Sequence, residues 1–101
     1  MNVNKKKEGD VLTVIIEGVL DIKTAPKLSK ELEGELDGVK SLVFDLARTE
    51  YTSSSGLRVL LDAFQTISKN GGSMSLINVN KAFYDILKIT GFTDFLDIRQ
   101  A

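Results

Sequence analysis

A chain of 101 residues with 43% hydrophobic residues can bury one core, and we expect a single domain over residues 1–101. The formal net charge of -1, from 13 basic and 14 acidic residues, argues against direct nucleic-acid binding, which needs a basic face. Cysteine and histidine are absent, which excludes disulfides, Cys-based metal sites and histidine-dependent catalytic triads. We expect no cofactor and no metal.

The basic run at residues 5–7 is the one cluster of positive charge. It is typical of a solvated strand end or a frayed terminus, and a membrane or nucleic-acid contact is the less favoured interpretation. The apolar run at residues 11–16 is too short for a signal-peptide core or a membrane span. We therefore expect a cytoplasmic protein with no membrane partner, and a monomer.

The N-terminal part of the chain shows two strand patterns. A weak strand at residues 3–7 leads through a turn at Gly9 into the β-branched run at residues 11–16, which Gly18 is expected to end.

A helix is predicted next. Thr24 stands where it can cap the first free amides, and Pro26 falls in the first turn, where its missing N–H does no harm. Gly38 is the predicted stop. The residues predicted to share the inner face of this helix are Ala25, Leu28, Leu32 and Leu36.

The middle of the chain predicts a buried strand and a long helix. Residues 42–46 are almost continuously apolar, which is typical of a strand buried on both faces by helices. Residues 47–52 are expected to be a linker. A helix follows from about residue 55 to residue 70. Its predicted inner face consists of Leu57, Leu60, Leu61, Phe64 and Ile67.

The last third predicts a strand at residues 73–77, a helix capped by Asn80 and closed by Gly91, and a short strand at residues 95–98. The residues expected to face inward on that helix are Ala82, Phe83, Ile86, Leu87 and Thr90. Strands that alternate with helices indicate an α/β fold, with a mixed sheet of four to five strands packed against helices.

Residues 53–56, Ser-Ser-Ser-Gly, lead directly into the long helix. One interpretation is capping, in which a serine oxygen accepts a hydrogen bond from a free helix amide and Gly56 eases a tight turn. The other is a regulatory site. A helix N-terminus favours an added phosphate, and Gly56 would let another protein approach the serines closely.

The chain resembles STAS domains of the bacterial anti-sigma-factor antagonist type. The segments that carry this resemblance are Gly18-Val19-Leu20-Asp21, Thr24-Ala25, residues 42–46, residues 54–61 and Thr90-Gly91-Phe92. They occur in the family's order over nearly the whole chain. The resemblance implies a single STAS-like domain that sequesters an anti-sigma factor, which is also a serine kinase, and so regulates transcription. It also implies that phosphorylation by this kinase inactivates the domain and that a phosphatase restores it.

The family's phosphorylated serine maps to Ser55, with Ser54 and Ser53 as alternatives. The family often has Asp at the position of Ser53, so this chain lacks a local negative charge that a kinase would meet. The resemblance also implies a partner-binding role for Asp21, Thr52, Ser54, Gly56 and Arg58.

Some of the family's landmark positions also have a simpler structural interpretation. Asp21 can tie the turn after its strand, and Asp45, another family landmark, can pair with neighbouring backbone amides. Arg58 can be a solvated residue paired with Asp62. Tyr51 is expected on the same edge as Thr52.

Two other functions stay open. One is a passive STAS module that binds a small ligand, such as a nucleotide or a lipid, or scaffolds another signalling partner. The sequence has no Walker-type loop, so a nucleotide site would have to be of an atypical kind. The other is an enzyme with a serine nucleophile, which the absence of Gly-x-Ser-x-Gly and of histidine disfavours. We therefore expect a binding protein and not an enzyme.

Overall fold

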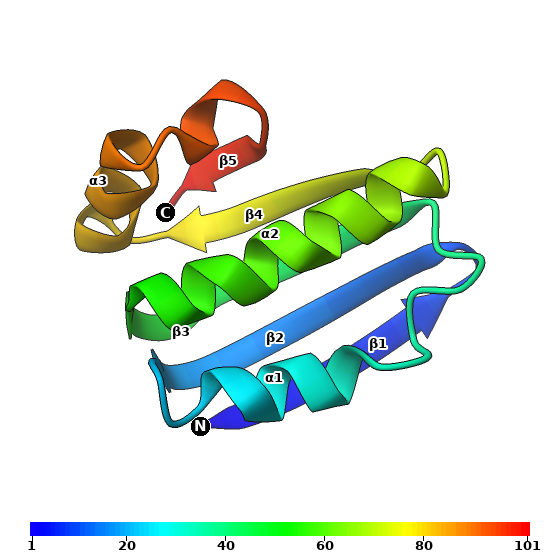
Figure 1. Cartoon of the computed structure of the whole chain (residues 1–101), viewed down its shortest axis with the longest axis horizontal. Coiled ribbons are helices and arrows are strands. Elements are labelled where there is room, and N and C mark those ends of the chain that lie inside the picture. The colour runs from blue at the N-terminus through cyan, green and yellow to red at the C-terminus, as the bar shows by residue number, and fades with distance from the viewer.

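The computed structural model describes residues 1–101, which form five strands and three α-helices, and Figure 1 shows their arrangement. The elements in chain order are β1 (Asn2–Glu8), β2 (Val11–Leu20), α1 (Ala25–Leu32), β3 (Ser41–Thr52), α2 (Ser54–Lys69), β4 (Ser73–Val79), α3 (Lys81–Ile89), the 3-10 turn η1 (Phe92–Asp94) and β5 (Asp97–Gln100). None of the helices combines the length and the apolar character needed to cross a membrane.

The five strands form one mixed sheet in the order β1-β2-β3-β4-β5. β1 runs antiparallel to β2, and the four strands from β2 to β5 run parallel to one another. Each pair of successive parallel strands is connected by a helical crossover, through α1, α2 and α3 in turn, and α1 and α2 lie on the same face of the sheet (Figure 1). The predicted α/β class with a mixed sheet is confirmed.

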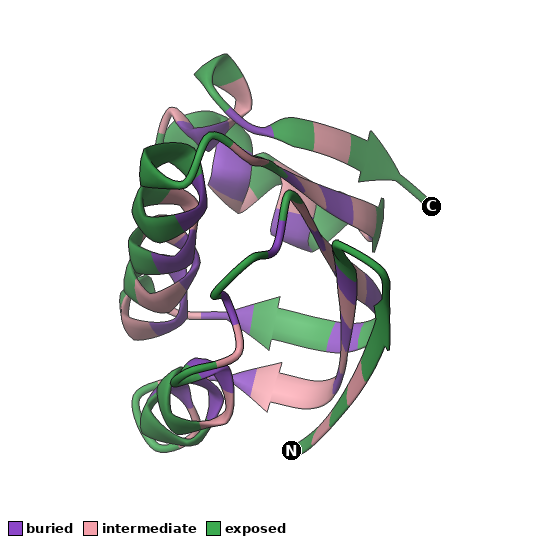
Figure 2. Ribbon diagram, turned by 90° about the vertical axis from the view of Figure 1, so that its right-hand side faces the viewer, coloured by how far each residue is buried: buried purple, intermediate pink, exposed green.

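Strand side chains alternate between a covered and an uncovered face. On the covered face, β3 buries Leu42, Phe44 and Leu46 completely, while Val43 and Asp45 on the other face are only half-buried. The prediction that this strand is buried on both faces is therefore wrong, because α1 and α2 lie on one side only (Figure 2). The central cluster of 22 buried hydrophobic residues joins the covered face of the sheet to α1 and α2, and it also includes residues of α3 and η1.

The predicted linker at residues 47–52 is also wrong, because β3 continues as a strand to Thr52. It can do so because β2 continues past Gly18 to Leu20 and supplies a parallel partner. The register shifts twice along β2, between Ile15 and Glu17 and between Gly18 and Val19. Gly18 has a φ of +108°, a conformation that glycine adopts easily, so the strand bends there and does not end.

Smaller differences occur near the other ends. α1 ends at Leu32, although Leu36 is still buried by the chain that follows, and the last strand is Asp97–Gln100. In α3, Phe83 and Leu87 face the core as predicted, and Ile86 is half-buried. Ala82 and Thr90 are exposed, contrary to prediction. A helix of 9 residues presents too narrow an inner stripe to bury both of its ends.

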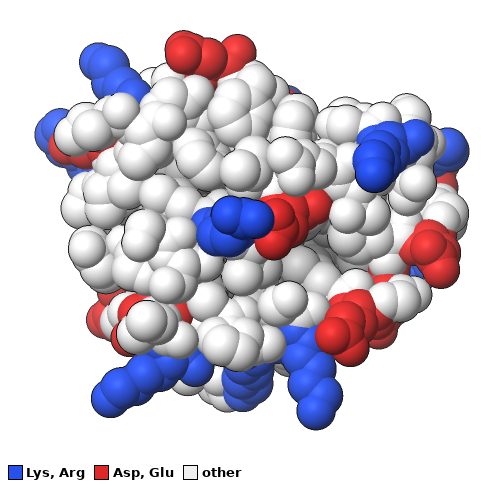
Figure 3. All heavy atoms as spheres, viewed as in Figure 1, with Lys and Arg blue, Asp and Glu red and all other residues white.

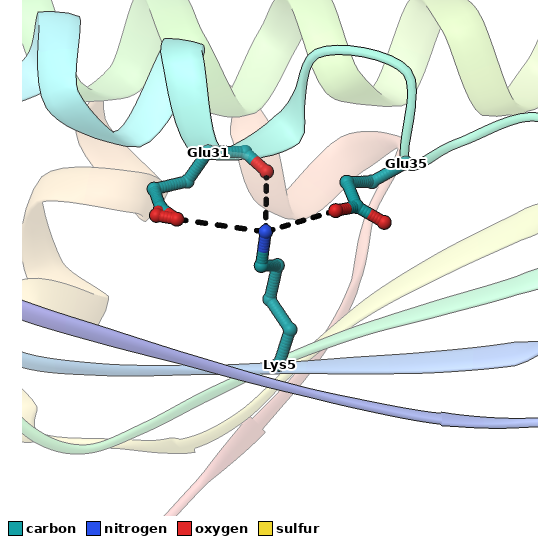
Figure 4. A network of polar contacts seen from close by, with 3 residues as sticks. All are labelled: Lys5, Glu31 and Glu35. Atoms are coloured by element: carbon teal, nitrogen blue, oxygen red, sulfur yellow. Dashed lines mark hydrogen bonds and ion pairs between the residues drawn. The ribbon is translucent and has the colours of Figure 1, made fainter.

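Lys5 connects β1 to the end of α1 (Figure 4). Its Nζ donates to the Glu31 carbonyl oxygen at 3.0 Å and to Glu35 Oε1 at 3.0 Å, and lies 3.5 Å from Glu31 Oε1. The hydrogen bond to Glu35, together with both carboxylate charges, raises the pKa of Lys5 above its ordinary value. The expectation of a solvated or frayed basic run is therefore wrong for this lysine, which anchors the helix.

Candidate functional site

The parallel strands bring the predicted site residues to one edge of the sheet. β2, β3 and β4 end there at Leu20, Thr52 and Val79, and the chain then enters the loops that precede α1, α2 and α3 (Figure 1). We call this the carboxyl edge and define it by residues 21–24, residues 53–56 and Asn80. Ligand sites of open parallel sheets commonly lie at such an edge.

The serine turn is held against the neighbouring strand by its backbone. The Ser53 amide donates to the Leu20 carbonyl oxygen at 2.9 Å, and the Leu57 amide donates to the Ser53 carbonyl oxygen at 3.1 Å. Ser53 is the N-cap residue of α2, with φ -101° and ψ 178°. Its side chain makes no capping hydrogen bond, and its hydroxyl oxygen is buried without a partner. At this residue the predicted capping by a serine oxygen is therefore not seen.

The three serines differ in accessibility. Ser54 is exposed, Ser55 is half-buried, and the hydroxyl oxygen of Ser53 is inaccessible. A kinase must reach the oxygen that it modifies, so this geometry favours Ser54 and Ser55 over Ser53 as acceptors.

The N-terminus of α2 carries partial positive charge. The first amides of a helix lack intrahelical partners, and the aligned peptide dipoles add partial positive charge. The first turn of α2 contains no acidic residue. A phosphate on Ser54 or Ser55 would therefore enter a favourable field.

Gly56 is explained by packing inside the protein. A Cβ at this position would lie 2.6 Å from Leu20 Cγ and 2.9 Å from the Leu20 carbonyl oxygen, and it would collide with the Thr52 hydroxyl. Thr52 itself is 1% exposed, and its hydroxyl donates to the Ser53 carbonyl oxygen at 3.1 Å. Neither side of this contact offers a surface to a partner, so Gly56 opens no approach to the serines. The glycine lets α2 start close to β2.

Asp21 organises the loop between β2 and α1. Its Oδ1 accepts hydrogen bonds from the Lys23 amide at 2.9 Å and the Thr24 amide at 3.1 Å. The Thr24 amide, then the Lys23 amide, and the Lys23 charge hold the pKa of Asp21 below its usual range. The Thr24 hydroxyl donates to the Val19 carbonyl oxygen at 2.7 Å and accepts from the Asp21 amide at 2.8 Å. Thr24 thus ties the loop and, contrary to prediction, does not cap α1.

Arg58 and Tyr51 remain accessible. The Arg58 side chain is 75% exposed, and its Nε lies 3.2 Å from Asp62 Oδ1, so the predicted surface pair is present. Tyr51 is 50% exposed. Figure 3 shows acidic and basic side chains dispersed over the face formed by α1 and α2, with uncharged surface between them.

Asp45 lies on the uncovered face of the sheet. Its Oδ1 accepts from the Ala47 amide at 3.1 Å and from Asn78 Nδ2 at 3.0 Å. The simpler interpretation of Asp45, pairing with nearby backbone, therefore describes what the carboxylate does, and the Asn78 amide adds a second donor.

Sequence reasoning missed two residues at the carboxyl edge. Asn80 was assigned only a cap, which it provides by accepting from the Phe83 amide at 2.8 Å. Its Nδ2 also lies 3.1 Å from the Thr49 carbonyl oxygen, which connects α3 to β3. Ile22 was not noticed, although it is 73% exposed between Asp21 and Lys23. An isoleucine in a loop outside any periodic pattern was the available signal.

The STAS-domain family model matches residues 2–101. This protein belongs to the STAS domain family. The STAS chain is similar to the anti-sigma-B factor antagonist of Bacillus subtilis, with 34% identity over 97% of this chain and 92% of the relative. The predicted resemblance is thereby confirmed.

Solved structures support the same fold. One is an anti-sigma factor antagonist from Mycobacterium paratuberculosis, with a TM-score of 0.87 and 23% identity over 99% of this chain and 86% of that one. Another is the Bacillus cell fate determinant SpoIIAA in its phosphorylated form, with a TM-score of 0.76 and 13% identity over 96% of this chain and 90% of that one. At these identities the likeness establishes the STAS fold.

Proposed function

We propose that this STAS protein is an anti-sigma factor antagonist, which binds an anti-sigma factor and is inactivated when that partner, a serine kinase, phosphorylates Ser55. The observation that carries the proposal is the 34% identity, over nearly the whole of both chains, to a protein named as an anti-sigma-B factor antagonist. The protein acts by binding and not by catalysis, and a phosphatase restores the active form.

The geometry of the carboxyl edge supports this function. Ser55 and Ser54 stand in the first turn of α2, which contains no acidic residue, so the helix dipole favours a phosphate there. SpoIIAA, which shares the fold, is known in a phosphorylated form. Ser55 is the preferred acceptor from the family pattern, and Ser54, which is more exposed, is the alternative.

Phosphorylation would weaken binding because it adds charge to a surface fitted to a neutral hydroxyl. A phosphoserine carries about -1.5 to -2 charges at neutral pH. Burying that charge against a partner without matching cations costs several kcal/mol, and each 1.4 kcal/mol changes an affinity about tenfold. Arg58 lies three residues after Ser55 on the same helix face and is free to turn from Asp62 toward the phosphate.

The test measures affinity for the purified anti-sigma factor kinase of the same organism. Unphosphorylated wild type and Ser55→Ala should bind equally, and Ser55→Asp should bind at least about tenfold more weakly. Ser54→Ala controls for the choice of acceptor, and the kinase should still inactivate it through Ser55. If Ser55→Ala and Ser55→Asp bind equally well, phosphorylation of Ser55 is not the switch.

Mass spectrometry of the protein from its own cells distinguishes the alternative. Partial phosphate on Ser55 that changes between growth and stress agrees with the proposal. No phosphate on Ser53, Ser54 or Ser55 under any condition would instead favour the passive STAS module that binds a nucleotide or lipid, or scaffolds another partner.

A further inference from the structure

The most exposed large apolar side chain at the carboxyl edge is Ile22, at 73% exposure. A lone exposed isoleucine needs no explanation in general. Ile22 differs through its position, because it lies in the loop beside the serine turn and the chain on both sides of it is fixed.

Hydrogen bonds on either side of Ile22 hold this loop. The carboxylate of Asp21 accepts from two amides that follow Ile22, and the Thr24 hydroxyl binds the Val19 carbonyl oxygen and the Asp21 amide. The backbone that carries Ile22 is therefore ordered before any partner arrives. A preorganised apolar side chain contributes more to affinity, because less conformational freedom is lost on binding.

The same loop adjoins the serines. Ile22 follows Leu20 by two residues, and the Leu20 carbonyl oxygen accepts the hydrogen bond of the Ser53 amide. A stable interface covers roughly 800 Å² on each partner, a patch that extends about 16 Å from its centre. A protein of that footprint bound at Ser54 or Ser55 therefore reaches the adjoining loop that carries Ile22.

We propose that Ile22 is the apolar anchor of the partner-binding surface and enters an apolar recess of the anti-sigma factor. Asp21 and Thr24 are positioning residues that hold Ile22 outward. This inference rests on the proposed function and adds a contact to it. Interfaces commonly depend on a few desolvated side chains of this kind, surrounded by contacts of little individual weight.

The anchor also explains how one phosphate can have a large effect. A contact made by Ile22 excludes water from its neighbourhood, so a dianion on Ser55 would lose hydration when the partner closes on it. Without the Ile22 contact, water should remain near Ser55 in the complex. The loss of affinity caused by the phosphate should then be smaller. Ile22 and Ser55 are therefore expected to be coupled.

The experiment compares the affinities of Ile22→Ser and wild type for the purified anti-sigma factor kinase. Loss of a buried isoleucine contact predicts a drop of about ten- to a hundredfold. Ile22→Val should retain most of the affinity. Because the side chain is exposed, the thermal midpoint of Ile22→Ser should match wild type.

Two controls on the same chain match this change. Ile89→Ser alters an isoleucine that is 84% exposed at the end of α3, and Val11→Ser alters a valine that is 37% exposed at the opposite edge of the sheet. Both should bind within about twofold of wild type. In the Ile22→Ser, Ser55→Asp double variant, the combined loss should be smaller than the product of the single losses.

The outcomes separate this inference from the proposed function. If Ser55→Asp abolishes binding while Ile22→Ser stays within twofold of wild type, the anchor is wrong and the proposed function stands. An equal loss in Ile89→Ser also overturns the anchor. If wild type does not bind the kinase at all, the proposed function fails and the anchor fails with it.

Discussion

Gly56 and Leu20 are packed so closely that a methyl group on the glycine would lie 2.6 Å from Leu20 Cγ. This contact joins the first turn of α2, which carries the serines, to the last residue of β2, which precedes the Asp21 loop. Because Gly56 has no side chain, the start of α2 can lie directly against the end of β2, which brings the serine turn close to the Asp21 loop.

Replacement of this glycine by alanine should destabilise the protein. Gly56→Ala forces α2 away from β2, and overpacking of this kind costs about 1–3 kcal/mol in the free energy of unfolding. Urea denaturation measures the difference. Ser54→Ala, an exposed change two residues away, should stay within about 0.5 kcal/mol of wild type. A Gly56→Ala variant as stable as wild type would mean that α2 shifts without cost.

The hydroxyl of Ser53 should contribute nothing to stability. It is buried without a hydrogen-bond partner, although N-cap serines are generally worth about 1 kcal/mol relative to alanine. Ser53→Ala removes this unsatisfied group and should leave the free energy of unfolding unchanged or raise it. Denaturation curves of the two proteins decide the matter. A loss of about 1 kcal/mol would show that the hydroxyl caps α2 in solution.

A negative charge in the first turn of α2 should stabilise the protein while it weakens partner binding. Ser55→Asp places a carboxylate at an uncapped helix N-terminus and should raise the free energy of unfolding by about 0.3–1 kcal/mol. Ser68→Asp, an exposed change in the last turn of the same helix, is the matched control and should lower it. Equal effects of the two changes would refute the helix-dipole argument.

The Lys5 contacts should be lost at high pH. Because Glu35 and Glu31 raise the pKa of Lys5 in the folded state, its stabilisation is complete below the usual lysine value of about 10.4 and is lost as the pH rises through the higher folded pKa. The difference in unfolding free energy between wild type and Lys5→Met should be below about 1 kcal/mol. This difference should decrease as the pH rises through the folded pKa of Lys5. Lys6→Met, on the other face of β1, should show no such change. A constant difference would exclude titration of Lys5 as its source.

The sequence alone determined the fold class, the approximate place of each element and the location of the serine turn. Hydrophobic periodicity is local, and it identified core residues such as Leu60 and Phe83. It also placed Leu61 and Phe64 on the inner face of α2, where both are only half-buried. The ordered landmarks around Asp21 and Ser55 were enough to predict the STAS family.

The tertiary structure alone decided which face of the sheet is covered, how far β3 extends and what each site residue contacts. Residues 47–52 form a strand because β2 lies beside them, and no local pattern records that neighbour. α2 starts against Leu20, and this packing leaves Gly56 in close contact with β2 and buries Thr52 and the Ser53 hydroxyl. The exposed Ile22 lies in a loop that adjoins the serine turn, because the Ser53 amide binds the Leu20 carbonyl oxygen. These two loops are distant in sequence, so their contact depends on long-range packing.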